Sequence, residues 1–186
     1  MCYPAEENRS ANSAVTSYTT AAIDATTTTC WIAAYAFSHP DLTAALTRAH
    51  ARKVDVRLLV TPTQQNPIYS TAPELARAGI QVRTDRKHKL FHNKYAILDH
   101  NQTLTGSANF TRNADEQNAE NAVIIDDPET NRAFRADFTH HWEHADPYRV
   151  IPPKPRKPTP TPPDLQIPNR RPRKKGTPLW HASPVP

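Results

Sequence analysis

The amino-acid sequence predicts an α/β protein in which helices cover both faces of a mixed β-sheet, an α/β/α sandwich. Two observations support this fold class. Short apolar segments typical of strands alternate with amphipathic segments typical of helices. The last amphipathic segment repeats large apolar side chains at helical spacing, which gives it one face for packing on a sheet. We expect residues 1–148 to form a single folded domain of ordinary size.

The first half of this domain supplies two helices and two strands. Residues 10–28 are predicted to be helical although their many threonines disfavour a helix, and residues 31–37 are predicted to form a buried strand. A second helix begins near Ser38, because four apolar residues then share one helical face at i, i+3, i+4 and i+7, namely Leu42, Ala45, Leu46 and Ala49. Residues 54–60 alternate apolar and charged side chains, which predicts a strand.

The second half adds two helices and four short strands. Residues 72–78 are predicted to form a helix that ends at Gly79, a typical C-cap residue. Strands are predicted at residues 81–84, 95–98, 103–105 and 122–125. A final helix begins at Pro128, and its apolar residues recur at i, i+4, i+8 and i+11 as Phe134, Phe138, Trp142 and Ala145.

Residues 149–186 are predicted to form a disordered tail rather than a second domain, because residues 151–186 hold 12 of the 19 prolines and show no apolar period. Residues 151–186 also carry eight Lys and Arg residues against Asp164 alone, which gives them a net charge of +7. The net charge of the whole chain is +5. The other 150 residues therefore have a net charge of −2, so net charge does not identify the folded part as a nucleic-acid-binding protein. The tail is expected either to tether the protein to a polyanion or to act as a solvated linker.

The rest of the composition does not identify the cellular compartment of the protein. Cys2 and Cys30 are too few for a disulfide framework and are not spaced as metal ligands. No apolar run approaches the length of a membrane span, and residues 1–10 do not resemble a signal peptide, so we expect a soluble chain as written.

The segment FHNKYAILDHNQTLTGSANF, residues 91–110, is more polar than two buried strands require. Residues two apart in a strand point to the same side, so His92 and Lys94 are predicted to share one face. Gly106 allows a close backbone approach, and the hydroxyl of Ser107 and the amide of Asn109 follow it. A histidine nucleophile beside a lysine, a hydroxyl and an amide is a plausible phosphate-binding group.

These residues and their intervals resemble the HKD signature of the phospholipase D superfamily, as His92-x-Lys94-x4-Asp99-x6-Gly106-Ser107-x-Asn109. Segments outside the signature, including GIQVRTD, NAENAVII and FTHHWEH, are similar to the small bacterial Nuc-like endonucleases that carry one copy of the motif. The likeness covers about residues 3–146. It implies a phospholipase D-like fold and a catalytic domain over residues 1–148.

The resemblance also implies a mechanism. His92 would attack the phosphorus of a phosphodiester and form a phosphohistidine that water later cleaves. Lys94, Ser107 and Asn109 would bind the substrate phosphate and offset the charge that builds in the transition state. No metal and no other cofactor is expected for this chemistry.

Two carboxylates complete the catalytic residues that the resemblance implies. Glu120 would accept a hydrogen bond from the second ring nitrogen of the histidine nucleophile and so fix its tautomer. Asp99 would orient the site rather than act as a base.

A homodimer with a shared active site is expected, because the leaving oxygen needs a proton donor and the superfamily takes it from a second copy of the motif. This chain has one HxK sequence, and His88 is followed by Lys89 and Leu90 rather than by a correctly spaced lysine. Each His92 would then face its twin across a two-fold axis.

Two further groups of residues have alternative interpretations. His140, His141 and His144 have a spacing that a metal could use on a helix, but no carboxylate or cysteine clearly completes the set, so surface histidines are expected. A basic run ahead of the motif either lines a groove for a nucleic-acid backbone or is a solvated loop; it consists of Arg83, Arg86, Lys87 and Lys89.

The substrate is not fixed by the motif, because nucleases, phospholipases and phosphatidyltransferases all act on a phosphodiester. We expect an endonuclease of low sequence specificity, on DNA or RNA, because the similar segments run through the whole body and no lipid-binding insertion is visible. A phospholipase D that hydrolyses glycerophospholipids such as phosphatidylcholine is the alternative, and an inactive nucleic-acid-binding module is a third interpretation.

The start of the chain leaves localisation open. Relatives usually begin with a signal peptide and a first strand that ends near a Ser-Pro, whereas here Met1-Cys2-Tyr3-Pro4 stands where that strand would finish. We expect either a shortened cytoplasmic protein, or a true start upstream with an export signal and a periplasmic or secreted protein.

Overall fold

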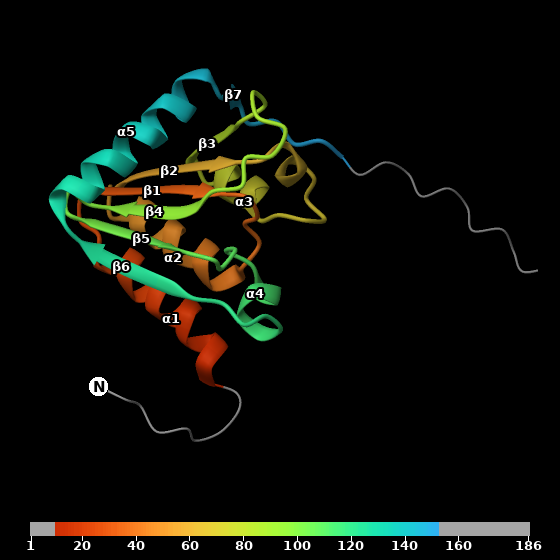
Figure 1. Cartoon of the computed structure of the whole chain (residues 1–186). Helices are drawn as coiled ribbons and strands as arrows, with labels where there is room; N and C mark the ends of the chain where they lie inside the picture. Colours follow the sequence, from red (N-terminus) through yellow and green to blue (C-terminus); the bar gives the residue numbers. More distant parts are fainter. Residues whose placement is uncertain (1–9, 153–186) are drawn as a thin grey trace, which may run out of the picture. The chain divides into compact units, whose positions relative to one another are not determined.

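The computed structural model describes residues 10–152, which form a seven-stranded sheet with helices on both faces (Figure 1). The strand order is β6-β5-β4-β1-β2-β3-β7. The strands are β1 (Thr29–Ala34), β2 (Asp55–Val60), β3 (Gln81–Thr84), β4 (Lys94–Leu98), β5 (Gln102–Gly106), β6 (Ala122–Asp126) and β7 (Asp146–Pro147). The helices are α1 (Ser10–Ala25), α2 (Pro40–Ala51), α3 (Ala72–Arg77), α4 (Arg112–Glu116) and α5 (Pro128–His144), with a 3₁₀ turn, η1, at Pro62–Gln65.

The sheet is mixed because the central strand β1 has neighbours of opposite direction. It runs parallel to β2, with Ile32 opposite Leu58, and antiparallel to β4, with Ile32 opposite Ala96. The parallel half continues from β2 to β3, and the antiparallel half continues from β4 through β5 to β6. The change of direction at β1 brings the start of β4 to the end of β1, which is where the candidate site lies.

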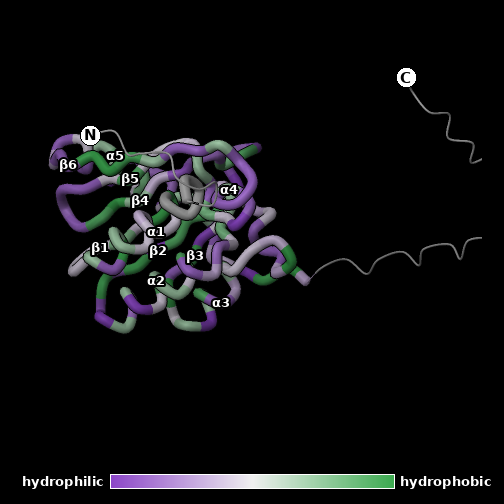
Figure 2. The backbone as a smooth tube through the Cα atoms, turned by 90° about the horizontal axis from the view of Figure 1, so that it is seen from below, coloured by the Kyte–Doolittle hydropathy of each residue, from purple (hydrophilic) through white to green (hydrophobic). Residues whose placement is uncertain are grey.

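One face of the sheet is covered by α1, α2 and α3 (Figure 1). Leu42, Leu46 and Ala49 of α2 are buried there against Ile32 and Leu58 of the sheet. Hydrophobic residues gather in the strands, and hydrophilic residues lie in the surrounding turns (Figure 2). Burial of such side chains, about 1.5–3 kcal/mol each, is the main contribution to the stability of this layer.

Among the described residues, α5 is the helix that covers the opposite face, through an aromatic cluster. Phe138 is fully buried and stacks between Trp31 of β1 and Trp142 of α5, with ring centroids 5.2 and 5.4 Å apart. The helix begins at Asp127, whose side chain accepts a hydrogen bond from the backbone N–H of Thr130 at 2.7 Å. The apolar stripe predicted from the sequence is therefore the packing face of α5.

The structure confirms the predicted fold class and most of the predicted elements. It shortens two of them, since α1 ends at Ala25 and β1 ends at Ala34, with Phe37 forming an isolated bridge to Phe110. The elements η1, α4 and β7 were not predicted; each is too short to show a periodic pattern.

The predicted boundary at residue 148 falls close to the end of the described residues. Tyr148 packs against the core, and the backbone N–H of Ile151 donates to the carbonyl of Gln65 at 2.9 Å. The rest of the predicted tail, residues 153–186, lies outside the described residues, as does Cys2. Within residues 10–152, no helix is long and apolar enough to cross a bilayer.

Candidate active site

The candidate site forms where the end of β1 meets the start of β4. The backbone N–H of Tyr35 donates to the carbonyl of Asn93 at 2.8 Å, so the antiparallel pairing continues one step past the strand. This contact fixes the backbone between His92 and Lys94. His92 itself is exposed and Lys94 is half-buried.

His92 and Lys94 contact each other directly, as the two-residue spacing predicts. The ammonium Nζ of Lys94 lies 3.2 Å from Nδ1 and 3.3 Å from Nε2 of His92, and it donates to the His92 carbonyl oxygen at 3.2 Å. Burial lowers the pKa of Lys94 from its ordinary value, and the nearby Glu120 carboxylate opposes this shift. A cation therefore lies against the imidazole, where a phosphoryl group would also bind.

Tyr35 is a third member of this group, and sequence reasoning did not find it. Its ring lies 4.5 Å from the ring of His92, centroid to centroid, and Lys94 Nζ lies 5.4 Å from its centroid. The second distance is within the range of a cation–π interaction. The sequence showed only that Tyr35 follows β1. The pairing register of β1 and β4 was needed to show that Tyr35 lies beside His92.

Ser107 and Glu120 form a second group of polar contacts. Ser107 Oγ donates to Glu120 Oε2 at 2.5 Å and accepts from the backbone N–H of Asn121 at 3.1 Å. Asn118 Nδ2 donates to Glu120 Oε1 at 3.0 Å. The hydrogen bonds from Ser107 and Asn118 lower the pKa of Glu120, and the charge of Lys94 contributes in the same direction. Within the described residues Glu120 contacts Ser107 rather than His92.

Gly106 is required by the neighbouring strand rather than by a ligand. A Cβ atom at this position would lie 2.2 Å from the carbonyl oxygen of Asn121 and 2.8 Å from Cα of Ala122, both backbone atoms of β6 or its approach. The close approach expected from the sequence is therefore present, but its partner is the chain itself. Asn109 follows, and its buried Oδ1 has no hydrogen-bond partner in the described residues.

Asp99 does not join the other motif residues. It follows Leu98 at the far end of β4, about 16 Å from Lys94 at about 3.3 Å per strand residue. Its carboxylate accepts hydrogen bonds from the backbone N–H groups of Thr27, Thr28 and Thr29 at 2.8–3.2 Å. Through these contacts Asp99 holds the α1–β1 turn against β4, and the orienting role expected from the motif stays a prediction.

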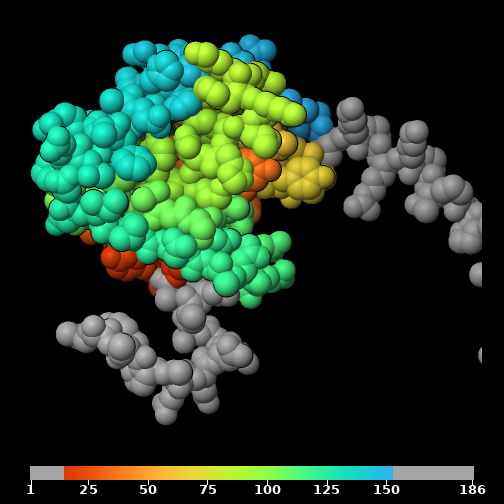
Figure 3. All heavy atoms as spheres, in the orientation of Figure 1, coloured from red at the N-terminus to blue at the C-terminus, as the bar shows by residue number. Residues whose placement is uncertain are grey.

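A groove of about 690 Å³ opens beside His92. One wall is formed by Lys94, Gly106 and Ser107, and the other by Phe134 and Asp137 of α5. Figure 3 shows the yellow-green segment around residues 85–98 and the teal helix α5 side by side on one face. The predicted residues His92, Lys94 and Ser107 thus line one groove, whereas Asn109, Glu120 and Asp99 do not.

Comparison with known proteins identifies this arrangement. A family model described as "Cardiolipin synthase, PLD-like domain" matches residues 19–142. The crystal structure of Nuc from Salmonella typhimurium, described as a phospholipase D family member, superposes with a TM-score of 0.68 at 34% sequence identity, covering 72% of this chain and 90% of Nuc. The chain belongs to the phospholipase D superfamily.

Curated relatives within the superfamily include lipid enzymes. A phospholipase D of Rickettsia conorii is 39% identical over 112 residues, which is 60% of this chain and 56% of that protein. The mitochondrial cardiolipin hydrolase of Mus musculus is 39% identical over 124 residues, which is 66% of this chain and 56% of that protein. The chain therefore spans about half the length of these curated relatives.

The basic run ahead of the superfamily motif divides into two parts. Arg83 donates to the carbonyl of Trp142 at 2.7 Å and stacks on its ring at 4.9 Å. Arg86 contacts Asp146 at 3.3 Å. Lys87 and Lys89 are exposed, and their side chains have no partner within residues 10–152. Only the two lysines are therefore available for a ligand.

The structure also corrects the interpretation of the helix histidines. His140 is exposed, as expected of a surface histidine. His141 and His144 instead turn inward, with side chains 13% and 21% exposed, and both contact the buried carboxylate of Asp85. Asp85 is the carboxylate that the sequence did not reveal, because it lies 56 residues before His141.

Proposed function

We propose that this protein is a phosphodiester hydrolase in which His92 is the nucleophile. The contact between Lys94 Nζ and the ring nitrogens of His92, at 3.2 and 3.3 Å beside an open groove, carries the proposal. A ring nitrogen of His92 attacks phosphorus, and the bond from phosphorus to the leaving oxygen breaks. Water then attacks the phosphohistidine, and the N–P bond breaks to restore the imidazole. Because imidazole is the nucleophile, the first step needs no metal-activated water.

The groups around His92 have distinct roles in this proposal. Lys94 and Ser107 line the groove and would hold the non-bridging oxygens, where negative charge builds in the transition state. Asn109 is proposed as a third phosphate-binding group. Glu120 accepts from Ser107 and acts electrostatically on Lys94, so it would position both of them.

A homodimer would supply the acid that protonates the leaving oxygen. His92 is the only imidazole among the described residues that line the groove. The hydroxyl of Tyr95 is a poor acid, because burial and its 2.7 Å hydrogen bond to Asp137 raise its pKa. Since the acid contributes about 10²- to 10⁴-fold, we infer that the partner's copy of the same imidazole provides it across a two-fold axis.

Nucleic acid is the substrate that we propose first. Lys87 and Lys89 stand exposed in the loop that leads to His92, and a pair of unpaired cations close to a phosphodiester-cleaving group suits a polyanionic backbone. Contacts of this kind carry no base specificity, so the nuclease would cut DNA or RNA with little sequence preference.

Phospholipid is the alternative substrate, and a different observation favours it. Leu90 is 58% exposed between the lysines and His92, and Ile68 and Tyr69 are 63% and 61% exposed. Exposed apolar side chains are suited to the surface of a phospholipid bilayer, and the lysines before Leu90 could contact its phosphates. The same apolar side chains would be covered if they lay in the dimer interface.

Parallel assays separate these functions. The protein would be incubated with plasmid DNA and with phosphatidylcholine vesicles, each with EDTA, with the fold followed by circular dichroism. We expect nicked DNA, no released choline, and a loss of at least about 10²-fold in His92→Ala but not in His100→Ala, an exposed histidine at the far end of β4. Intact DNA beside released choline would establish the lipid enzyme, and DNA binding without cleavage would indicate the inactive module.

The oligomeric state is tested independently by sedimentation of the purified full chain. We expect a dimer whose dissociation on dilution removes activity in parallel. A strictly monomeric protein with full activity would exclude the shared site.

A further inference from the structure

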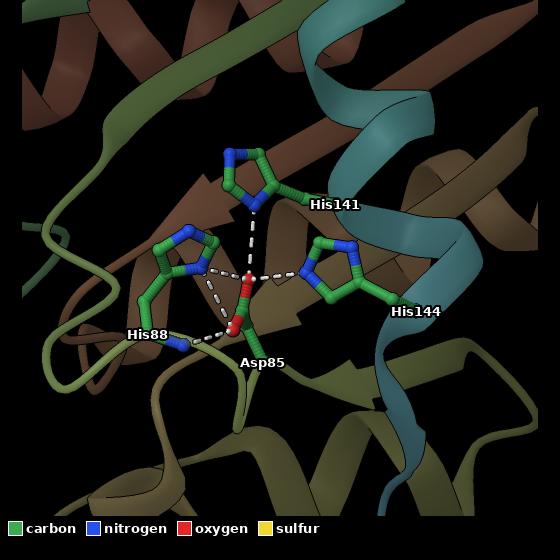
Figure 4. Close-up of side chains that lie close together, drawn as sticks. All are labelled: Asp85, His88, His141 and His144. Carbon is green, nitrogen blue, oxygen red and sulfur yellow. Dashed lines mark hydrogen bonds and ion pairs between the residues drawn. The ribbon is translucent and has the colours of Figure 1, made fainter.

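A second cluster of chemical groups lies on the α5 side of the sheet, outside the groove. It consists of Asp85, which follows β3, together with His88 of the next loop and His141 and His144 of α5 (Figure 4). Asp85 Oδ2 lies 2.9 Å from Nδ1 of His141, 3.1 Å from Nδ1 of His88 and 3.1 Å from Nε2 of His144. Three imidazoles thus converge on one carboxylate oxygen.

The carboxylate is buried, which makes its surroundings informative. The side chain of Asp85 is 0% exposed, and a buried carboxylate requires strong compensation. The backbone N–H of His88 donates to Asp85 Oδ1 at 3.1 Å, and the three imidazole nitrogens lie 2.9–3.1 Å from Oδ2. One buried carboxylate is therefore surrounded by three ring nitrogens.

We propose that Asp85, His88, His141 and His144 form a binding site for one divalent transition-metal ion of the Zn²⁺ class. Three imidazole nitrogens and one carboxylate oxygen are a ligand set that Zn²⁺ prefers, and four ligands complete its tetrahedral coordination. The four ligand atoms lie within 4.8 Å of one another. Metal–ligand bonds of about 2.0–2.2 Å require ligand atoms about 3.3–3.6 Å apart. The contacts of Asp85 with the three imidazoles, now 2.9–3.1 Å, would lengthen by a few tenths of an ångström, and ligand atoms up to 4.8 Å apart would approach by about 1.2 Å through ring rotation.

The outer side of the cluster has the second carboxylate that metal-bound histidines commonly use. Nε2 of His141, the nitrogen away from Asp85, lies 3.6 Å from Oδ1 of Asp137. Asp137 is held by the hydroxyl of Tyr95 at 2.7 Å. At 3.6 Å this contact is longer than a hydrogen bond, and a shift of about 0.6 Å on metal binding would let the carboxylate fix the tautomer that leaves the inner nitrogen free for the metal.

The site also has an access route and a structural consequence. His88 is 43% exposed, so an ion can reach the buried carboxylate from its side. The ring of Phe91, itself 2% exposed, packs against His141 with centroids 5.1 Å apart, and Phe91 directly precedes His92. An ion bound here would fasten the loop that carries the nucleophile to α5. The site is structural, and its existence does not depend on the proposed reaction.

The test is metal binding by the full chain, purified without a polyhistidine tag. After removal of bound metal, Zn²⁺ would be titrated in competition with a chromophoric chelator, and Co²⁺ would be added separately to read its visible absorption. We expect one Zn²⁺ per chain, the intense visible bands of tetrahedral Co²⁺, and a melting temperature that rises with Zn²⁺.

Matched variants identify the ligands. His88→Ala and His144→Ala should each lower Zn²⁺ affinity at least about tenfold and remove the thermal shift. His140→Ala is the control, because His140 stands next to the cluster on the same helix and supplies no ligand atom. Asp137→Asn should lower affinity about 10- to 100-fold while keeping the Co²⁺ spectrum.

Three results would overturn the proposal. The first two are uptake of less than one equivalent of Zn²⁺ by the wild-type protein at micromolar concentrations, and the weak spectrum of octahedral Co²⁺. Alternatively, His140→Ala could lose as much affinity as His144→Ala. The first two results are measured on the wild-type protein. They would therefore overturn the proposal even if a variant failed to fold.

Discussion

The replacement Asp99→Asn tests whether this motif residue acts on structure or on catalysis. Asn has nearly the same shape, and it tolerates the positive φ of 52° at this position, so the backbone is not strained. The change removes the negative charge and turns one acceptor oxygen into a donor; in the position of Oδ2 this donor would face the N–H group of Thr27. The α1–β1 turn should therefore loosen from β4.

The magnitude follows from the pKa of Asp99. Burial would raise it, but the N–H groups of Thr29, Thr28 and Thr27 outweigh burial and lower it from 3.8 to about 2. The lowered pKa corresponds to about 2 kcal/mol of preference for the ionised form at neutral pH. For a folded body of this size, we expect the melting temperature to fall by about 5–10 °C.

The sign of the pH dependence follows from the lowered pKa in the folded state. The stabilisation is complete above the unfolded pKa of 3.8 and is lost as pH falls through about 2. The difference in melting temperature between wild type and Asp99→Asn should therefore be full at pH 7 and shrink between about pH 4 and pH 2. Other acidic groups titrate in both proteins and cancel in the difference.

The assay combines thermal unfolding with hydrolysis of a chromogenic phosphodiester at 25 °C. We expect kcat for Asp99→Asn within about twofold of wild type, since the residue lies at the other end of β4. The control is Asp126→Asn, an exposed carboxylate with a single hydrogen bond from Asn101 at 2.8 Å, which should change stability by no more than about 0.5 kcal/mol. A large loss of kcat with an unchanged melting temperature would refute the structural role.

Three other substitutions test separate features. Gly106→Ala places a Cβ 2.2 Å from the carbonyl of Asn121, so unfolding by denaturant should show a loss of about 1–3 kcal/mol, and an unchanged midpoint would contradict the close approach. Tyr35→Leu removes the ring from Lys94 and should lower kcat/KM about two- to fivefold, whereas Tyr35→Phe should not; equal losses in both would point to the hydroxyl instead. Phe138→Ala empties a fully buried position and should cost about 3–5 kcal/mol by calorimetry, with a cost below about 1 kcal/mol arguing against its place in the core.

Periodic segments were predictable from the sequence because one face of each packs on the sheet. The spacing of Phe138 and Trp142 was enough to predict α5 and its buried stripe. The pairing of His92 with Lys94 was also predictable, because strand geometry places residues two apart on the same side. These features depend on local geometry, which the order of residues reflects directly.

Contacts between distant segments were not predictable in the same way. The strand predicted at residues 95–98 separates Asp99 from Lys94, but the motif interval does not show that the Asp99 carboxylate contacts the distant turn at Thr28. Helical spacing brought His141 and His144 to one face, yet their partner Asp85 came from another strand end. Tyr35 met His92 only through the register of β1 and β4.

The mixed sheet also constrains the order in which the protein can fold. Strands β4 and β5 are joined by a short turn and can pair locally, whereas Cys30 of β1 must find Leu98 of β4 across a long stretch of chain. Closing such a loop is slow, because its entropy is lost before the contacts form. A folding intermediate could therefore hold Lys94 in its hairpin while Tyr35 is still elsewhere. Hydrolytic activity would appear only when β1 pairs with β4. Incompletely folded chains would therefore be inactive.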